Sequence, residues 1–198
     1  MDDSPADPDQ RYCLDLVQKH AADLYLSDLL LPEAVLHDIA VVHAFHVELT
    51  HIALAMAEPM AAQIRLQWWS DVVEGQRAEE AQGNPVARAL LKVMERHSLP
   101  GTGFAAKAQA HVFDLYNDPM GDRATFEGYC GETRSCLFQW AVLIGAPERA
   151  KQAGEASGHA GVAAAIVNIL ENMAHLHDHG RVHLPSDLLE AVGLDGGS

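Results

Sequence analysis

The chain has 198 residues and a mass of 21.4 kDa, and its 13 Lys and Arg residues against 28 Asp and Glu residues give a formal net charge of −15. Apolar residues make up 48% of the sequence and charged residues 21%, a balance typical of a folded globular domain rather than a disordered chain. The negative charge argues against a protein that wraps nucleic acid or lies on anionic lipid, because both would repel it.

The N-terminal segment and the cysteines bear on the compartment of the protein. The first ten residues are acidic and contain no basic or apolar stretch, so we expect no secretory signal there. No uninterrupted apolar run approaches the roughly 20 residues that a bilayer requires, and we expect no transmembrane segment. The three cysteines lack CxxC spacing, which indicates free thiols in a reducing compartment. We expect a cytoplasmic protein with a disordered acidic tail over 1–9 and a single domain over 10–198.

Prolines divide the chain into its predicted elements. Proline breaks helices but is tolerated in their first turn, and here it falls between long stretches rich in Ala and Leu. The predicted helices span residues 10–31, 33–56, 60–75, 84–97, 103–117, 123–144, 148–156 and 159–177. Few Val, Ile or Thr residues alternate with a period of two, so we expect no sheet. The predicted fold class is all-α.

Three local patterns refine these elements. Asn84 precedes Pro85, which is the combination of an N-cap residue and a first-turn proline that begins many helices. The segment 158–174 is small and apolar nearly all round, which predicts a helix buried at the centre of a bundle. After Pro185 a new helix begins and soon reaches glycines, so we expect the chain to be shorter than its fold requires.

Three separated stretches resemble one protein family. They are RLQWW at 65–69, the NIL triplet at 168–170, and GRVHLP, in which the family has a tyrosine at the place of His183. In these stretches and their order, residues 12–185 resemble the squalene/phytoene synthase family, the head-to-head prenyl synthases. The resemblance implies an isoprenoid-synthase-like helical bundle around a central cavity, without the C-terminal helices of the full family fold.

The chemistry of that family uses two aspartate-rich DxxxD motifs on facing helices. The i, i+4 spacing puts both carboxylates on one helix face, so that four of them hold Mg²⁺ against a diphosphate leaving group. The resemblance places these aspartates at positions with other residue types, namely Thr50 or His51, Leu54, Asn172 and Leu176. The arginine beside the second motif is replaced by Glu171. Prenyl transfer is therefore expected to be absent unless other ligands hold the metal.

A branch of the same family also lacks these motifs. Residues 48–73, residues 84–91 and the small-residue helix after His159 are similar to the branch that contains the mitochondrial complex I assembly factor and its bacterial relatives. The resemblance implies a pseudoenzyme that acts as an assembly factor for NADH:quinone oxidoreductase, in the cytoplasm or at the periphery of the inner membrane. Its expected partner is a complex I subunit, or its ligand an isoprenoid or other lipid, with no cofactor. The alternative is an active prenyl transferase of squalene or phytoene biosynthesis with displaced Mg²⁺ ligands.

The residues beside the lost aspartates include two carboxylate–imidazole pairs. Glu48 and His51 are spaced i, i+3, and Glu171 and His175 are spaced i, i+4 on the helix expected to face them. Such ligands suit zinc, iron or manganese better than Mg²⁺, although pairs of this kind are also common on helices that bind no metal.

Other residues are candidates for contact with a ligand. These candidate ligand-binding residues are Arg65, Trp69, Tyr129, Asn168 and Arg181. Core packing is the alternative for the tryptophan, and a helix-capping or ion-pair role is the alternative for Arg65. The resemblance also places Tyr129, Arg134 and Ser135 where the family lines its cavity. The histidines from 175 to 183 are interpreted as an exposed helix end, because Gly180 interrupts the helix.

Overall fold

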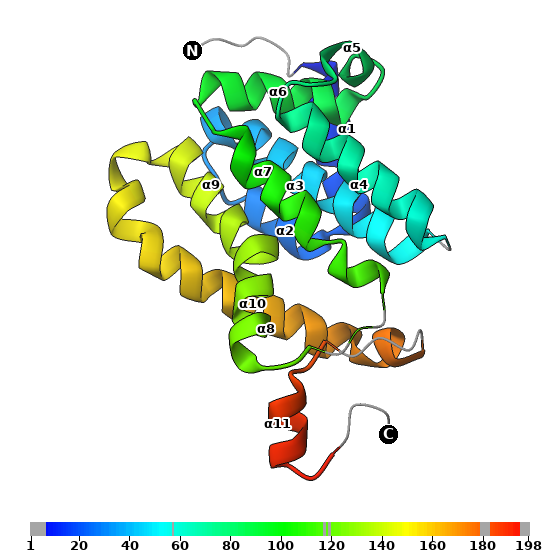
Figure 1. The fold of residues 1–198 in the computed structure, drawn as a ribbon. Helices are drawn as coiled ribbons and strands as arrows, with labels where there is room; N and C mark the ends of the chain where they lie inside the picture. The colour runs from blue at the N-terminus through cyan, green and yellow to red at the C-terminus, as the bar shows by residue number, and fades with distance from the viewer. Residues whose placement is uncertain (1–6, 57, 117, 119, 179–182, 195–198) are drawn as a thin grey trace.

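The computed structural model describes residues 7–194 except 57, 117, 119 and 179–182. For residues 175–178 it describes the backbone and not the side chains. Within these residues every regular element is a helix, which confirms the all-α prediction (Figure 1). The first half contains the helices α1 Pro8–His20, α2 Ala22–Asp28, α3 Glu33–Ala55, α4 Pro59–Val73, α5 Ala78–Ala81, α6 Pro85–Arg96 and α7 Gly101–Ala110.

The second half adds short irregular turns to the longer helices. Its elements are the 3₁₀ turn η1 Phe113–Leu115, α8 Arg123–Cys130, the π-helical turn η2 Gly131–Ser135, α9 Cys136–Gly145, the 3₁₀ turn η3 Pro147–Arg149, α10 Ala150–Asp178 and α11 Ser186–Ala191. Asn84 caps α6 as predicted, because its Oδ1 accepts the backbone N–H of Ala87 at 3.0 Å.

Several predicted segments differ from the structure. The predicted helix 103–117 ends at Ala110, and the 3₁₀ turn η1 follows it. The segment 10–31 forms α1 and α2 rather than one helix, because the backbone of Ala21 leaves the helical region with φ −146° and ψ 70°. Residues 148 and 149 lie in η3, and the rest of the two predicted segments 148–156 and 159–177 belongs to the single helix α10. A glycine in a helix costs only about 1 kcal/mol, so Gly158 does not end α10.

The helix α3 is the centre of the bundle. It packs against α1, α2, α4, α6 and α9, and it passes behind α4 and α7 in Figure 1. Its Phe45 lies 5.2 Å from the ring of Trp69 and 5.7 Å from that of Phe104, which stacks on Trp140 at 3.9 Å. These aromatic contacts join four helices into one core.

By length and composition α3 is also the one described helix that could cross a bilayer. In its most apolar window, however, 72% of the residues are buried inside the bundle. A central core helix passes the same test of hydropathy, so this feature is weak evidence for a membrane span.

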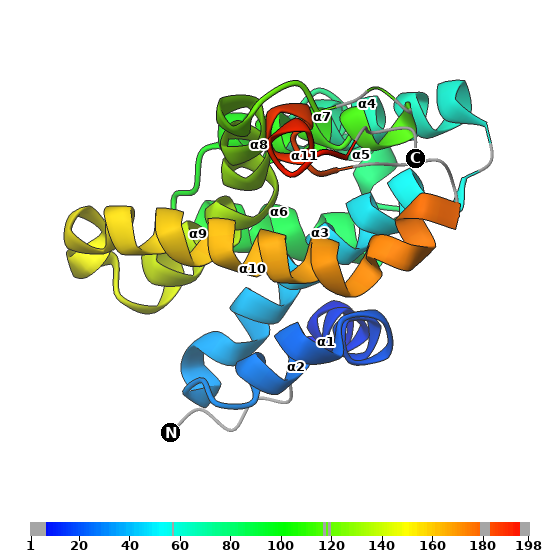
Figure 2. The same ribbon diagram turned by 90° about the horizontal axis from the view of Figure 1, so that it is seen from below.

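The prediction that the segment 158–174 lies at the centre was wrong. Figure 2 shows α10 running along one side of the bundle, and it contacts α8, α9 and η2. Its other face leaves Ile166, Val167, Leu170 and Met173 exposed. Small residues on the inner face account for the composition, because a Cβ on Gly161 would overlap the backbone of Ser135 in η2.

Ion pairs tie the start of α1 to α6. Arg88 donates to both carboxylate oxygens of Asp9 at 2.6 and 2.9 Å, and Lys92 donates to Asp7 at 2.7 Å. Asp7 also caps α1 by accepting the N–H of Asp9. The structured part of the chain therefore begins before residue 10, and residues 1–6 of the predicted tail lie outside the described residues.

Candidate functional site

A cavity of about 350 Å³ opens between α2, α3, α8, η1, η2 and α10. Four positions predicted from the family motifs line it, namely Thr50, His51, Leu54 and Asn172, as do the predicted ligand-binding residues Tyr129 and Asn168. The side chain of Leu176 lies outside the described residues. Helices α3 and α10 thus present the two degenerate motifs to one space, as the resemblance implied.

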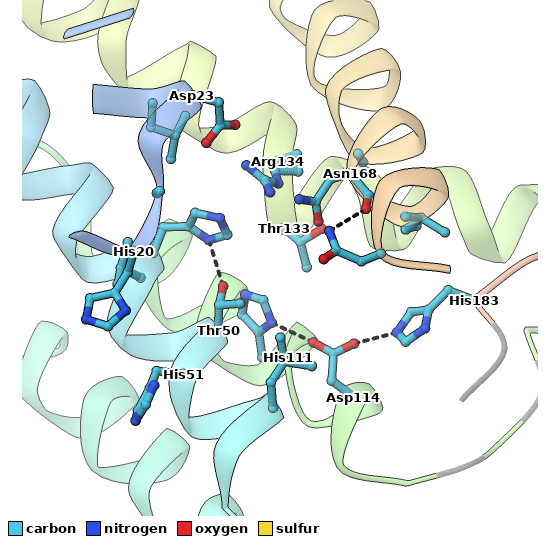
Figure 3. A pocket seen from close by; sticks show the side chains of 18 of the residues that line it. His20, Asp23, Thr50, His51, His111, Asp114, Thr133, Arg134, Asn168 and His183 are labelled. Carbon is cyan, nitrogen blue, oxygen red and sulfur yellow. Dashed lines mark hydrogen bonds and ion pairs between the residues drawn. The ribbon is translucent and has the colours of Figure 1, made fainter. Parts of the chain in front are cut away.

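The carboxylate of Asp114 is the hub of a hydrogen-bond network at this cavity. Oδ2 accepts the Nδ1–H of His111 at 2.7 Å, while Oδ1 accepts the Nε2–H of His183 at 2.9 Å and the hydroxyl of Tyr129 at 2.8 Å. The two imidazoles lie on opposite sides of the carboxylate (Figure 3). An ionised carboxylate only accepts hydrogen bonds, so each of these ring nitrogens carries the proton.

Local structure explains the position of this network. His111 follows α7 and Asp114 lies in the turn η1, so the i, i+3 spacing brings their side chains together. Tyr129 comes from α8, and His183 comes from the segment before α11. Three separate parts of the chain therefore meet at one carboxylate.

Electrostatics fixes the protonation states in this network. Burial alone would raise the pKa of Asp114, but the hydrogen bonds from His111 and His183 outweigh burial and hold that pKa well below its usual range. Burial lowers the pKa of His111 and lowers that of His46 well below its usual range. Burial and the neighbouring Asp114 raise the pKa of Tyr129. At neutral pH an ionised carboxylate therefore lies among neutral His111, His46 and Tyr129.

Each imidazole keeps one nitrogen without a partner. Nε2 of His111 and Nδ1 of His183 are buried and make no hydrogen bond to any described residue. The exposed fractions of the two residues are only 3% and 7%, yet both line the cavity. Buried polar atoms without partners are rare in proteins, so these nitrogens mark places where a molecule in the cavity would bind.

Two cations approach the cavity from the side of η2. Arg134 lines it directly, and Lys107 of α7 is fully buried and donates to the backbone carbonyl of Thr133, the residue before Arg134. Burial lowers the pKa of Lys107 from 10.5 to about 8 and also lowers the pKa of Arg134. This wall is positive although the whole chain is acidic.

Replacing Lys107 with Met should raise the free energy of unfolding at pH 7 by about 2 kcal/mol. The decrease in pKa from 10.5 to about 8 corresponds to about 3 kcal/mol of lost stability, and the lost hydrogen bond offsets about 1 kcal/mol of the gain. Because the unfolded chain keeps its proton longer, wild-type stability should rise between pH 8 and 10.5. Urea unfolding between pH 8 and 10.5 measures this rise, with exposed Lys151→Met as the control. If the free energy of unfolding rose equally steeply with pH in wild type and Lys107→Met, the expectation would be contradicted.

The remaining predicted ligand-binding residues lie elsewhere. Trp69 is 1% exposed and packs in the core against Phe45, so core packing, the alternative to ligand binding, describes its position. Arg65 is exposed on α4, and neither residue lines the cavity. Arg181 lies outside the described residues.

The predicted metal ligands are not brought together within the described residues. Of the four, His51 lines the cavity, whereas Glu48 and exposed Glu171 do not, and the side chain of His175 is outside the described part. No group of three or more His, Cys, Asp or Glu residues in that part is arranged to hold a metal ion. The side chains described thus do not fit a metal centre.

The motif positions offer Mg²⁺ no carboxylate among the described cavity residues. The carboxylates that do line the cavity are those of Asp23 and Asp114, and the latter already accepts three hydrogen bonds. A hydroxyl at Thr50 and an amide at Asn172 supply only neutral oxygens, which are poor replacements for carboxylates around a hard cation.

Sequence reasoning missed the hub of the site. Asp114 and His111 carry no motif of the family resemblance, and their i, i+3 spacing was the one local signal. The interpretation of His183 as part of an exposed helix end was wrong, because it is buried and hydrogen-bonds to Asp114. A contact across 69 positions of sequence leaves no local pattern.

Comparisons with known proteins agree with this architecture. The family model "Squalene/phytoene synthase" matches residues 17–197. Proteins named NADH dehydrogenase (ubiquinone) complex I, assembly factor 6, from Bos taurus and Homo sapiens, are both 28% identical, over 93% and 92% of this chain and 55% of each relative. A phytoene synthase of Thermus thermophilus is 27% identical over 96% of this chain and 63% of its own. The chain thus spans about half the length of the assembly factors it matches.

Solved structures support the same fold. A dehydrosqualene synthase in complex with ligand superposes with a TM-score of 0.75 at 21% identity, over 94% of this chain and 64% of the other. A squalene synthase from Alicyclobacillus acidocaldarius superposes with a TM-score of 0.74 at 19% identity, over 94% of this chain and 70% of the other. At this identity the likeness shows the isoprenoid-synthase-like helical fold alone.

Proposed function

This chain belongs to the squalene/phytoene synthase family, and we propose that it is a member without prenyl transfer that acts as an assembly factor for NADH:quinone oxidoreductase, or as a binder of an isoprenoid or other lipid. The observation that carries the proposal is the cavity wall, where Thr50, Leu54 and Asn172 occupy motif positions that need acids. Support for the assembly role comes from relatives named as complex I assembly factors, which match 93% of the chain.

The physical argument concerns the leaving group. Loss of a diphosphate needs its developing negative charge to be neutralised, which the family does with Mg²⁺ on carboxylates. Leu54 cannot coordinate a cation, and the buried hub at Asp114 is committed to three donors. A cavity of this kind keeps the shape for a ligand while losing the means of ionising it.

The alternative function is an active prenyl transferase with displaced metal ligands, favoured by the similarity to a phytoene synthase. We expect no diphosphate release above the protein-free blank when the chain is incubated with farnesyl or geranylgeranyl diphosphate and Mg²⁺ or Mn²⁺. A phytoene synthase serves as the positive control. Clear release that is lost in Glu48→Gln or Glu171→Gln would establish the alternative and overturn the proposal.

The assembly role is tested in the organism that encodes the chain. Deletion of the gene should reduce the amount of assembled NADH:quinone oxidoreductase on native gels, and the wild-type gene should restore it. The double variant Thr50→Ala, Asn172→Ala should restore it as well, because the proposed assembly role requires no catalysis by these two residues. Normal levels of the complex in the deletion strain would overturn the assembly role. Fractionation of the same cells tests the proposed location, in the cytoplasm or at the periphery of the inner membrane.

A further inference from the structure

Arg134 presents a positive charge to the cavity without an acceptor. Its guanidinium points into the space between η2 and α2, where Figure 3 shows Asp23 as the nearest labelled acid. No hydrogen bond or ion pair joins Arg134 to any other residue in the described part of the chain. Asp23 attracts this half-buried charge but makes no hydrogen bond to it, so the N–H donors of the guanidinium remain available to a bound anion.

The surroundings of Arg134 strengthen its attraction for an anion. Lys107 is buried behind it, with its ammonium on the carbonyl of Thr133. Two acids face the same space: Asp23 forms no ion pair with Arg134, and Asp114 is occupied by three hydrogen bonds. Two cations therefore face this part of the cavity, and the attraction of Asp23 offsets part of their positive charge without a hydrogen bond to Arg134.

A second, independent observation indicates a bound molecule. The buried Nε2 of His111 and Nδ1 of His183 lack partners and belong to residues that line this cavity. His111 is neutral at pH 7, so its free nitrogen accepts a hydrogen bond from a hydroxyl or from water. The cavity thus offers both a cation for an anionic oxygen and acceptors for a protonated one.

Apolar side chains also line the cavity, among further polar ones such as Thr50 and Asn168. The larger apolar residues that line it are Leu24, Val47, Leu54 and Ile169. Its volume of about 350 Å³ is at the lower end for ligand pockets, which favours one apolar chain over two. A ligand that matches these features has an anionic head and a single apolar tail.

We propose that Arg134 binds the phosphate or carboxylate head group of a single-chain lipid without a metal ion, while the apolar wall holds the chain. This inference rests on the lipid-binding part of the proposed function. It differs from metal-dependent diphosphate binding because the charge of the head group is balanced by a side chain of η2.

The test is isothermal titration calorimetry of the full chain in buffer with EDTA. The probes are dodecyl phosphate and dodecanoate below their critical micelle concentrations, and dodecanol below its solubility limit. At least one anion should bind with 1:1 stoichiometry and at least tenfold more tightly than dodecanol. A tighter dodecyl phosphate assigns a phosphate head, and a tighter dodecanoate assigns a carboxylate head.

Variants tie the binding to the guanidinium. Arg134→Gln should weaken the anions at least tenfold and leave the affinity for dodecanol unchanged, whereas Arg134→Lys should retain part of the affinity. Exposed Arg149→Gln, away from the cavity, should bind as wild type does. Thermal unfolding of each variant confirms that it is folded.

Three results would overturn the inference: no anion binding in EDTA, equal affinities for anion and alcohol, or unchanged binding by Arg134→Gln. None of these binding results bears on the proposed absence of prenyl transfer, which is tested by measuring diphosphate release. Conversely, diphosphate release with Mg²⁺ would remove that proposal whatever the Arg134 variants do.

Discussion

Replacing Asp114 with Ala should lower the free energy of unfolding at pH 7 by about 3–5 kcal/mol, the loss typical of removing one partner from a buried charged network. The buried donors of His111 and His183 and the hydroxyl of Tyr129 would all lose their acceptor at once. No other described acid hydrogen-bonds to these three groups, so no neighbouring carboxylate can take over.

Urea unfolding measures this loss, with Asp15→Ala as the control because Asp15 is exposed on α1 and should change stability by less than about 0.5 kcal/mol. Asp114→Asn separates charge from shape. The pKa of Asp114 is lower in the folded state than its ordinary 3.8, so the stability it contributes is present above pH 3.8 and is lost as pH falls through the folded value. On acidification wild type should therefore lose more stability than Asp114→Asn. A loss below about 1 kcal/mol in Asp114→Ala would show that the network carries little energy.

The sequence predicted helix boundaries well where residues within one turn determine them. Asn84 and Pro85 determine the start of α6 whatever surrounds it, because the cap and the fixed φ of proline act within one turn. The break at Ala21 and the continuity of α10 through Gly158 have no such local cause. In the folded chain α2 packs on α3 and α10 packs on η2, and a pattern of residues along the chain does not contain these contacts.

The candidate site divides in the same way. Thr50 and Asn172 could be placed at the cavity because motif spacing on a helix fixes the face on which a residue lies. Asp114 and His183 come from a 3₁₀ turn and from a segment between helices, and they meet only in the folded chain. Arg134 was placed at the cavity by resemblance, but its lack of an acceptor appears only from the contacts of the fold.

The net charge of the whole chain and the charge balance at the cavity therefore come from different residues. The net charge of −15 is carried by residues such as Glu155 and Glu148, which are exposed on the surface. Exposed charge of one sign favours solubility without reaching the interior. At the cavity, the charge balance is set by Arg134 and Lys107 against Asp23 and the Asp114 carboxylate, which is already occupied by donors.

Gly161 is the position where one methyl group should do most damage to the cavity. A Cβ at this position of α10 would overlap the backbone of Ser135 in η2, and backbone cannot rotate away as a flexible side chain can. The Oγ of Ser135 also donates to the carbonyl of Gly158 at 2.9 Å, so the same contact is held by a hydrogen bond. Separation of α10 from η2 would move Asn168 away from Arg134.

We expect Gly161→Ala to lower the free energy of unfolding by about 3 kcal/mol, at the upper end of the usual cost of overpacking, and Gly161→Val to lower it further. The matched control is Gly154→Ala on the same helix, where an added Cβ meets no atom within 4 Å. The control should stabilise the chain by about 0.5–1 kcal/mol, because alanine favours helix over glycine. Urea unfolding of the three variants gives the comparison, and a rise in stability for Gly161→Ala like that of the control would rule out the close contact between α10 and η2.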